Sequence, residues 1–251
     1  MVTTLVRGAG EPATVFAHGL GADIADTRPL GSGVDGTKVF YTARAHDGVE
    51  TARFDYEALA ADLRAVADEH GAGRALGVSM GAGALCRLVC DTPDRFERFV
   101  LFLPAVIDEP RGTGARDRLS ALGQAIARGD TAAVHELIAA ELPEAVRDTP
   151  AGRAYAAARV KILCRPSMRG IPARLAELVA VPDARLLSKV DSPVLVLGCR
   201  GDVAHPAAVA ERLAALLPKS QLHIFDKPDV MWTHRSELRE RIGHFLNSPR
   251  P

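Results

Sequence analysis

One short stretch constrains the fold more than any other part of the chain. Residues 74–85 read as a short apolar strand, the sequence Gly77-Val78-Ser79-Met80-Gly81, and the start of an apolar helix. A turn tight enough to expose the serine forces strained backbone angles on it, and side chains two residues before and after it would collide. This G-x-S-x-G pattern is typical of a nucleophile elbow. The alternative is an ordinary strand-to-helix turn in which Ser79 caps the helix.

Strand and helix patterns alternate on both sides of this stretch. The alternation predicts an α/β fold with a mostly parallel, doubly wound sheet. Between residues 108 and 187 the apolar positions show helical spacing and no convincing strand, which predicts a helical cap inserted between two strands. We therefore expect one domain: the first part of the core over 1–107, the cap over 108–187, and the second part of the core over 188–251.

Several expected elements are clear enough to state as residue ranges. Continuous apolar runs predict strands, and apolar residues at helical spacing predict helices. Outside the cap, the strands are expected at 13–17, 39–43, 75–78, 99–103, 193–197 and 221–225, and the helices at 56–70, 207–217 and 236–246. Within the cap, helices are expected at 117–127, 131–142, 150–163 and 173–180.

The bulk composition narrows the classes of partner. The chain has 251 residues, with 31 basic and 31 acidic side chains, so nothing favours a nucleic acid or an anionic membrane surface as a partner. Its four cysteines form no C-x-x-C motif and no zinc-binding pattern, which predicts reduced thiols and a cytoplasmic protein. We expect no metal site and no cofactor. The start of the chain lacks a signal-peptide pattern, and the apolar run 99–107 is too short to cross a bilayer.

Polar groups follow several of the predicted strands. In an open parallel sheet such groups gather at the carboxyl ends of the strands. His18-Gly19, Ser79 and Asp202 come directly after strand patterns, and His234 precedes the last helix. A serine hydroxyl needs a base in contact to act as a nucleophile, an imidazole can carry its proton, and a carboxylate can fix the imidazole tautomer. The order Ser, Asp, His therefore predicts a catalytic triad.

This order and these settings resemble the α/β-hydrolase fold family over nearly the whole chain. The nearest branch is a small bacterial one that holds esterases, lactonases, carbon–carbon bond hydrolases and cofactor-free haloperoxidases. The resemblance implies that Ser79 is the nucleophile, Asp202 the acid and His234 the base. The N–H groups of Leu20 and Met80 are expected to form the oxyanion hole, because the glycine-rich turn after the first strand lies beside the elbow.

Two alternatives stay open within that assignment. The family often has a Gly-His pair at the base, whereas Thr233 precedes His234 here. His205, three residues after Asp202, is a rival base. Asp108, just past the 99–103 strand, is a rival acid.

The substrate is expected to be a small molecule held between the cap and the loop after residue 20. His18, Gly19, Met231 and Trp232 are the candidate substrate-binding residues, and the apolar cap helices favour an apolar acyl group or a lactone. The chain is expected to be a monomer or a homodimer. The leading hypothesis is a serine hydrolase of esters, lactones or thioesters; the alternatives are a carbon–carbon bond hydrolase, a cofactor-free perhydrolase, and a non-catalytic binding protein.

Overall fold

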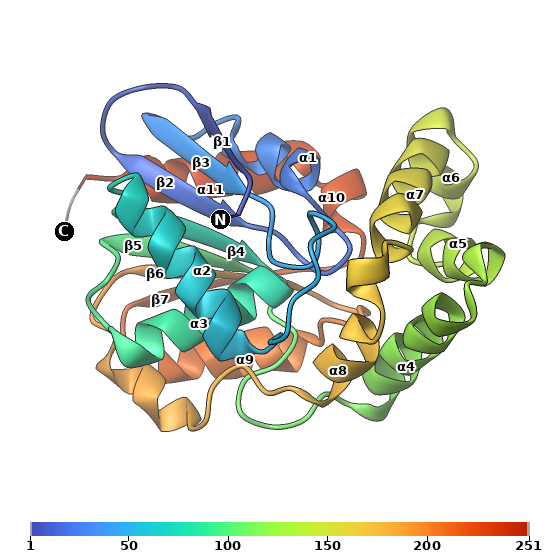
Figure 1. Cartoon of the computed structure of the whole chain (residues 1–251). Coiled ribbons are helices and arrows are strands. Elements are labelled where there is room, and N and C mark those ends of the chain that lie inside the picture. Colours follow the sequence, from blue (N-terminus) through green and yellow to red (C-terminus); the bar gives the residue numbers. More distant parts are fainter. Residues whose placement is uncertain (1, 250–251) are drawn as a thin grey trace.

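A seven-stranded sheet forms the centre of the molecule in the computed structural model, which describes residues 2–249 (Figure 1). The strand order is β1-β3-β2-β4-β5-β6-β7, and every neighbouring pair is parallel except β1 with β3. This arrangement confirms the predicted α/β fold with a mostly parallel sheet. The strands are β1 (Thr4–Arg7), β2 (Ala13–Ala17), β3 (Thr37–Tyr41), β4 (Arg74–Val78), β5 (Arg98–Phe102), β6 (Val194–Cys199) and β7 (Ser220–Phe225).

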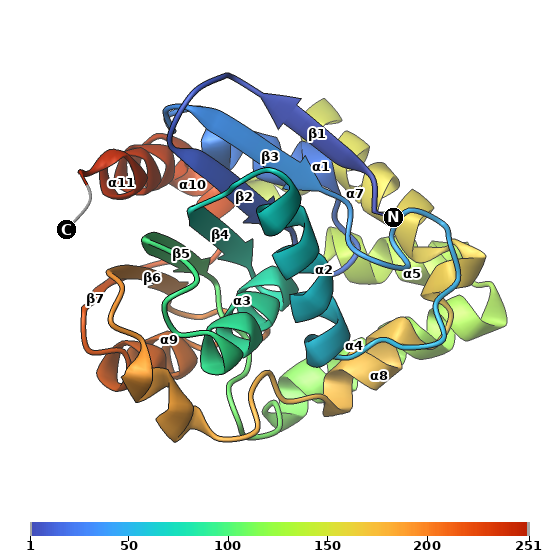
Figure 2. The ribbon, with the colours of Figure 1, turned by 60° about the vertical axis from the view of Figure 1, so that its left-hand side comes forward.

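Helices cover both faces of the sheet, as Figures 1 and 2 show. One face is covered by α2 (Tyr56–Glu69), α3 (Met80–Asp91) and α9 (Ala207–Leu216). The other face is covered by α1 (Ile24–Thr27), the 3₁₀ turn η1 (Arg28–Gly31) and α11 (Arg235–Asn247).

The central strands send side chains into two separate apolar clusters. Ala75 and Leu101 belong to the cluster under α2 and α3, whereas Leu76 and Val100 belong to the cluster under α11. Successive side chains of a strand point to opposite faces, so a strand that is covered on both sides must be apolar at every position. This requirement is why the runs around β4 and β5 could be read as buried parallel strands.

The residues between 108 and 187 form an arm of helices beside the sheet (Figure 1). No strand occurs between these two positions, in agreement with the predicted helical insertion. The division into core and cap as domains stays a prediction. The elements are α4 (Thr113–Arg128), α5 (Thr131–Ala139), α6 (Glu144–Arg147), α7 (Pro150–Leu163), η2 (Pro166–Met168), α8 (Ile171–Glu177) and η3 (Ala184–Lys189).

Two local contacts position α2 and α3. The carboxylate of Asp55 accepts a hydrogen bond from Ala58 N at 2.8 Å, which caps the start of α2. A Cβ on Gly83 of α3 would lie 2.3 Å from the ring of Tyr56 in α2. The glycine therefore permits close contact between α3 and α2. A short helix that the sequence did not predict, α10 (Val230–Thr233), follows β7.

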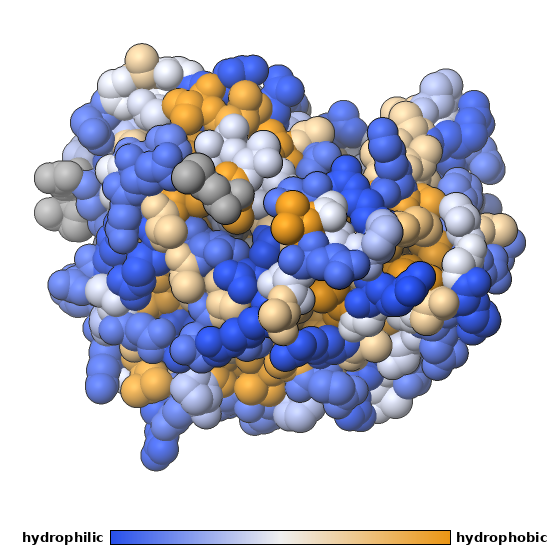
Figure 3. Space-filling view, in the orientation of Figure 1, coloured by the Kyte–Doolittle hydropathy of each residue, from blue (hydrophilic) through white to orange (hydrophobic). Residues whose placement is uncertain are grey.

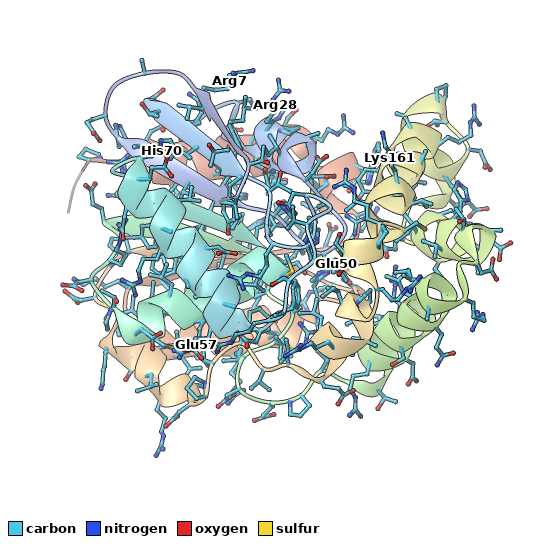
Figure 4. The ribbon with its side chains drawn as sticks, in the orientation of Figure 1. Arg7, Arg28, Glu50, Glu57, His70 and Lys161 are labelled. Atoms are coloured by element: carbon cyan, nitrogen blue, oxygen red, sulfur yellow. The ribbon has the colours of Figure 1, made fainter. Side chains whose placement is uncertain are left out.

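The outer surface carries charges of both signs. Figure 4 labels basic and acidic side chains at separate places on the surface: Arg7, Arg28 and Lys161 are basic, and Glu50 and Glu57 are acidic. The space-filling view shows a notch between the sheet region and the arm formed by α6 and α7 (Figure 3). Within residues 2–249, every helix is too short or too polar to span a membrane.

Candidate active site

The turn between β4 and α3 has the strained geometry that its sequence requires. Ser79 adopts φ 51° and ψ −106°, a conformation that non-glycine residues rarely occupy. A Cβ on Gly77 would lie 2.5 Å from Gly81 O, and a Cβ on Gly81 would lie 2.4 Å from Ala17 O of β2. The Ser79 carbonyl accepts from Gly83 N, while its hydroxyl makes no capping bond. The alternative of a simple N-cap serine is therefore excluded.

The hydroxyl of Ser79 instead contacts His205. The distance from Ser79 Oγ to His205 Nε2 is 2.8 Å, and the distance from His205 Nδ1 to Asp202 Oδ2 is also 2.8 Å. In a neutral imidazole one nitrogen donates and the other accepts. With Nδ1–H directed at the carboxylate, Nε2 is the acceptor for the Ser79 hydroxyl. This chain of contacts can move a proton away from the serine.

A single turn holds the carboxylate and the imidazole together. Asp202 Oδ1 accepts from Ala204 N at 2.8 Å and from His205 N at 3.0 Å, so the aspartate closes the turn that presents the histidine. Burial on its own would raise the pKa of Asp202. The bonds from the His205 ring and from the two backbone N–H groups outweigh it and lower the pKa to about 2. The carboxylate is therefore ionised at neutral pH.

The structure does not bring His234 to Ser79. His234 Nδ1 lies 2.8 Å from Thr233 Oγ1, its Nε2 lies 3.8 Å from Asp226, and its ring packs beside Phe225. The prediction that this histidine contacts the serine is wrong. The physical reason is α10: Asp229 begins it with a left-handed φ of 66°, and the extra helical turn places His234 away from the serine.

The rival acid Asp108 also lies outside this contact chain. Its Oδ1 pairs with Arg212 at 2.7 Å, and its Oδ2 accepts from Ala184 N at 3.1 Å. The guanidinium and the backbone N–H outweigh the effect of burial and lower the pKa of this carboxyl. Asp108 therefore connects the segment after β5 to η3 and α9, and Asp202 is the carboxylate beside the His205 ring.

Two backbone N–H groups near Ser79 are free. Among residues 2–249, neither Leu20 N nor Met80 N has a hydrogen-bond acceptor. The Gly19 carbonyl, which belongs to the same peptide unit as Leu20 N–H, accepts from His18 Nδ1 at 2.7 Å and from Ala22 N at 3.3 Å. In a trans peptide the N–H points opposite to the C=O. These bonds therefore fix the direction of the Leu20 N–H.

Two buried histidines hold the loop that carries Leu20. His18 Nε2 accepts from Ala43 N at 2.9 Å, and His46 Nε2 accepts from Gly21 N at 3.0 Å. A backbone N–H only donates, so both Nε2 atoms are unprotonated and both rings are neutral. Burial lowers the pKa of each ring, that of His46 to about 3. His18 is thus a support of the loop, and its role as a substrate contact stays a prediction.

A cavity of about 410 Å³ lies above Ser79, between the core and the cap. Of the four residues predicted to bind substrate, His18, Gly19 and Met231 line this cavity and Trp232 does not; contact with a substrate stays a prediction. Trp232 packs edge-on against Tyr155 and lines a smaller neighbouring groove of about 220 Å³. The lining is not uniformly apolar, because leucines of the cap alternate with the charged side chains of Arg111, Arg118, Glu141 and Arg159.

Comparison with known proteins identifies the family. The sequence profile of the alpha/beta hydrolase family matches residues 14–241. The chain belongs to this family. The fold of this α/β hydrolase is also similar to solved structures at low sequence identity, which supports the fold alone.

Three such structures illustrate the range. An esterase from Thermogutta terrifontis has a TM-score of 0.75 at 18% identity, over 98% of this chain and 92% of the other. The enol-lactonase from Burkholderia xenovorans has a TM-score of 0.78 at 18% identity, over 98% and 96%. A meta-cleavage product hydrolase from Pseudomonas fluorescens has a TM-score of 0.78 at 14% identity, over 98% and 94%.

The sequence of this α/β hydrolase did contain a signal for His205. The spacing D-x-x-H places the imidazole three residues after the carboxylate, within reach of it when the aspartate closes a turn on the following N–H groups. The resemblance to the family favoured the histidine before the last helix instead. In place of His234, the segment after β7 contributes Asp229 and Met231 to the cavity. Within residues 2–249, no three His, Cys, Asp or Glu side chains are grouped to bind a metal ion.

Proposed function

We propose that this α/β hydrolase cleaves carboxylic esters or lactones through an acyl-enzyme on Ser79, with His205 as the base and Asp202 as the acid. The observation that carries the proposal is the continuous contact from Ser79 Oγ through the His205 ring to Asp202 Oδ2, with 2.8 Å at each step. This line of contacts lies at a cavity large enough for a small molecule, beside the N–H groups of Leu20 and Met80, which have no acceptor among residues 2–249.

The proposed reaction begins with acyl transfer. Ser79 Oγ attacks the substrate carbonyl carbon while His205 Nε2 takes the hydroxyl proton, and the carbonyl π electrons move onto oxygen. The N–H groups of Leu20 and Met80 donate to that oxyanion. Collapse of the tetrahedral intermediate breaks the bond to the alcohol oxygen, which receives the proton from His205. The ionised carboxylate of Asp202 stabilises the imidazolium at each stage.

The second half of the reaction repeats these roles with water. His205 removes a proton from water, which attacks the acyl carbon, and the proton returns to Ser79 Oγ as the acid leaves. Because His205 contacts the serine directly, the same ring serves both halves. His234 takes no part in the proposed reaction.

The experiment compares three single variants with the wild type. Labelling with a fluorophosphonate and hydrolysis of p-nitrophenyl butyrate are measured for Ser79→Ala, His205→Ala and His234→Ala. We expect Ser79→Ala to lose labelling altogether, and both histidine variants to be labelled, His234→Ala at the wild-type rate and His205→Ala far more slowly. Hydrolysis should fall by at least about 10³-fold in Ser79→Ala and His205→Ala and stay within about two-fold in His234→Ala.

The outcomes separate the rival assignments. Loss of activity in His234→Ala with an active His205→Ala would overturn the proposed base. Wild-type labelling of Ser79 with no hydrolysis of any ester, lactone or β-diketone would point to a binding protein. Cleavage of β-diketones alone would favour a carbon–carbon bond hydrolase, and oxidation of halide in acetate with peroxide would favour a perhydrolase.

A further inference from the structure

The cavity above Ser79 contains three arginines from the segment 108–187, and they differ in how their donors are used. Arg111 is almost fully buried and donates to Leu175 O, Leu178 O and Tyr56 Oη. These bonds hold the start of the cap against α8 and α2. Arg111 therefore has a structural role that accounts for its burial.

Arg159 is also largely committed. Its Nη1 donates to Tyr155 Oη at 3.1 Å and its Nη2 donates to Leu20 O at 2.6 Å. The distance from Arg159 Nη2 to Glu141 Oε2 is 3.9 Å. Arg159 thus connects α7 to the loop beside Ser79, and its main donors are already directed at protein atoms.

Arg118 differs from both. Its Nη2 lies 2.5 Å from Glu141 Oε1, but among residues 2–249 none of its N–H groups makes a well-directed hydrogen bond. The side chain is two-thirds buried and lines the cavity. Its Nη2 is buried against Glu141, so the Nε and Nη1 donors are the ones available to a molecule in the cavity.

The charges around Arg118 are also incomplete. Glu141 is the carboxylate that faces both Arg118 and Arg159, so one negative charge faces two guanidinium groups. Asp202 lies close enough to act on Arg118, but it is bonded to the catalytic histidine. The remaining cavity carboxylates, Asp26 and Asp229, come from the core side, in α1 and just before α10 (Figure 1).

Burial of two cations beside a single anion, Glu141, leaves one positive charge without a counterpart, which is unfavourable. Burial lowers the pKa of Arg118, which shows the same cost on the charged form. A carboxylate on the substrate would supply the second negative charge and acceptor oxygens for the unused Nε–H and Nη1–H donors of Arg118, and such charge-assisted hydrogen bonds are strong.

We propose that Arg118 binds a carboxylate carried by the substrate, so that the preferred substrates are esters or lactones of carboxylate-bearing acids or alcohols. This inference rests on the proposed hydrolase function. It assigns the cap side of the cavity to the anionic end of the substrate and the Ser79 side to the bond that is cleaved. It differs from the expectation of an apolar acyl group or a lactone by adding a carboxylate to the substrate.

The test uses matched substrates and matched variants. The monoanionic ester p-nitrophenyl hydrogen glutarate is compared with its neutral methyl ester, and p-nitrophenyl hydrogen succinate and adipate vary the reach. A second pair places the carboxylate on the alcohol: the butyrate ester of 4-hydroxybenzoate and that of its methyl ester. Kinetics are measured for wild type, Arg118→Gln and Arg118→Lys. Arg116→Gln is the control, because Arg116 lies on the same helix but does not line the cavity.

In at least one pair we expect Arg118→Gln to lower kcat/KM for the anionic ester by about 10- to 100-fold relative to the neutral one. Arg118→Lys should retain part of the preference, and Arg116→Gln should leave it within about two-fold. An equal effect on anionic and neutral esters in both pairs, or no effect on either, would overturn the proposal.

A binding measurement separates this proposal from the proposed reaction. Millimolar glutarate should raise the Tm of the wild type and of Arg116→Gln, but not of Arg118→Gln, and neutral glutaramide should raise none of them. If no ester is hydrolysed and this pattern still appears, the hydrolase function fails while the carboxylate site stands. If esters are hydrolysed and glutarate has no effect that depends on Arg118, the carboxylate site fails and the hydrolase function stands.

Discussion

The buried ring of His46 makes the stability of the fold depend on pH. Its Nε2 accepts from Gly21 N at 3.0 Å and its Nδ1 donates to Arg44 O at 3.0 Å, so a second proton would place two N–H groups against each other. Burial and the nearby His18 lower the pKa of His46 from 6.5 to about 3. In the unfolded chain the ring regains its ordinary pKa of about 6.5.

The sign and size of the effect follow from proton binding. Between about pH 6.5 and about pH 3 the unfolded chain binds a proton at His46 that the folded chain excludes, so stability falls as the pH drops through this window. At about pH 8 the His46 ring is neutral in both the folded and the unfolded chain. At about pH 5 the unfolded state is favoured by about 2 kcal/mol through this ring alone. Any folded pKa below about 4 gives nearly the same figure.

The matched variant is His46→Gln. The amide oxygen of glutamine can accept from Gly21 N in place of Nε2, and the side chain does not titrate. Urea unfolding of both proteins at about pH 8 and about pH 5 gives two pH-dependent losses in free energy. We expect the loss in the wild type to exceed that in the variant by about 2 kcal/mol.

Other titrating groups, including His18, are present in both proteins and cancel in this comparison. Any constant destabilisation by the substitution cancels as well. Equal pH dependence in the two proteins would refute the reasoning, because it would mean that His46 takes up a proton without breaking its bond to the loop.

Three further predictions test the parts of the site separately. Gly81→Ala should lower the free energy of unfolding by about 3 kcal/mol in urea, because its Cβ would lie 2.4 Å from a β2 carbonyl, whereas Gly112→Ala, with open space, should change it by less than about 0.5 kcal/mol. Asp202→Asn should lower kcat on p-nitrophenyl butyrate by about 10⁴-fold, because an amide favours the wrong imidazole tautomer. Arg159→Gln should lower kcat on the same neutral ester by about 10-fold through the loss of its bond to Leu20 O, and an effect on KM alone would contradict this role.

Most of the fold could be predicted because its signals are local. The buried strands are continuous apolar runs, and the elbow needs glycines at fixed positions, so both are legible in the sequence. The boundaries moved where a terminal residue has a special conformation. The strand expected to end at Leu103 ends at Phe102, because Leu103 turns away with a φ of 50°. The helix expected from residue 173 begins at Ile171, because Pro172 is tolerated in a first helical turn.

The histidine that contacts Ser79 could not be assigned from the sequence for a different reason. His205 and His234 both follow a strand at the same edge of the sheet, and only the path of the chain after β7 decides between them. That path depends on Asp229 adopting a left-handed conformation, which starts a four-residue helix. Neither feature has a clear sequence signal. The free donors of Arg118 and the paired donors of Arg111 likewise differ only in three-dimensional contacts.

Asp202 and His205 lie in one turn, so fewer separate segments of the chain must be aligned with Ser79. His205 and Asp202 are fixed to each other by two hydrogen bonds, and a third from Ala204 N to Asp202 closes the same four-residue turn, so the long-range condition is that this turn meets Ser79. Two ladder bonds across β5 set that position: Ser79 N donates to Phe102 O at 2.9 Å, and Leu103 N donates to Leu197 O at 2.8 Å. The segment after β7 then does not have to provide a base. Its residues that line the cavity can differ according to the substrate that the cavity accepts.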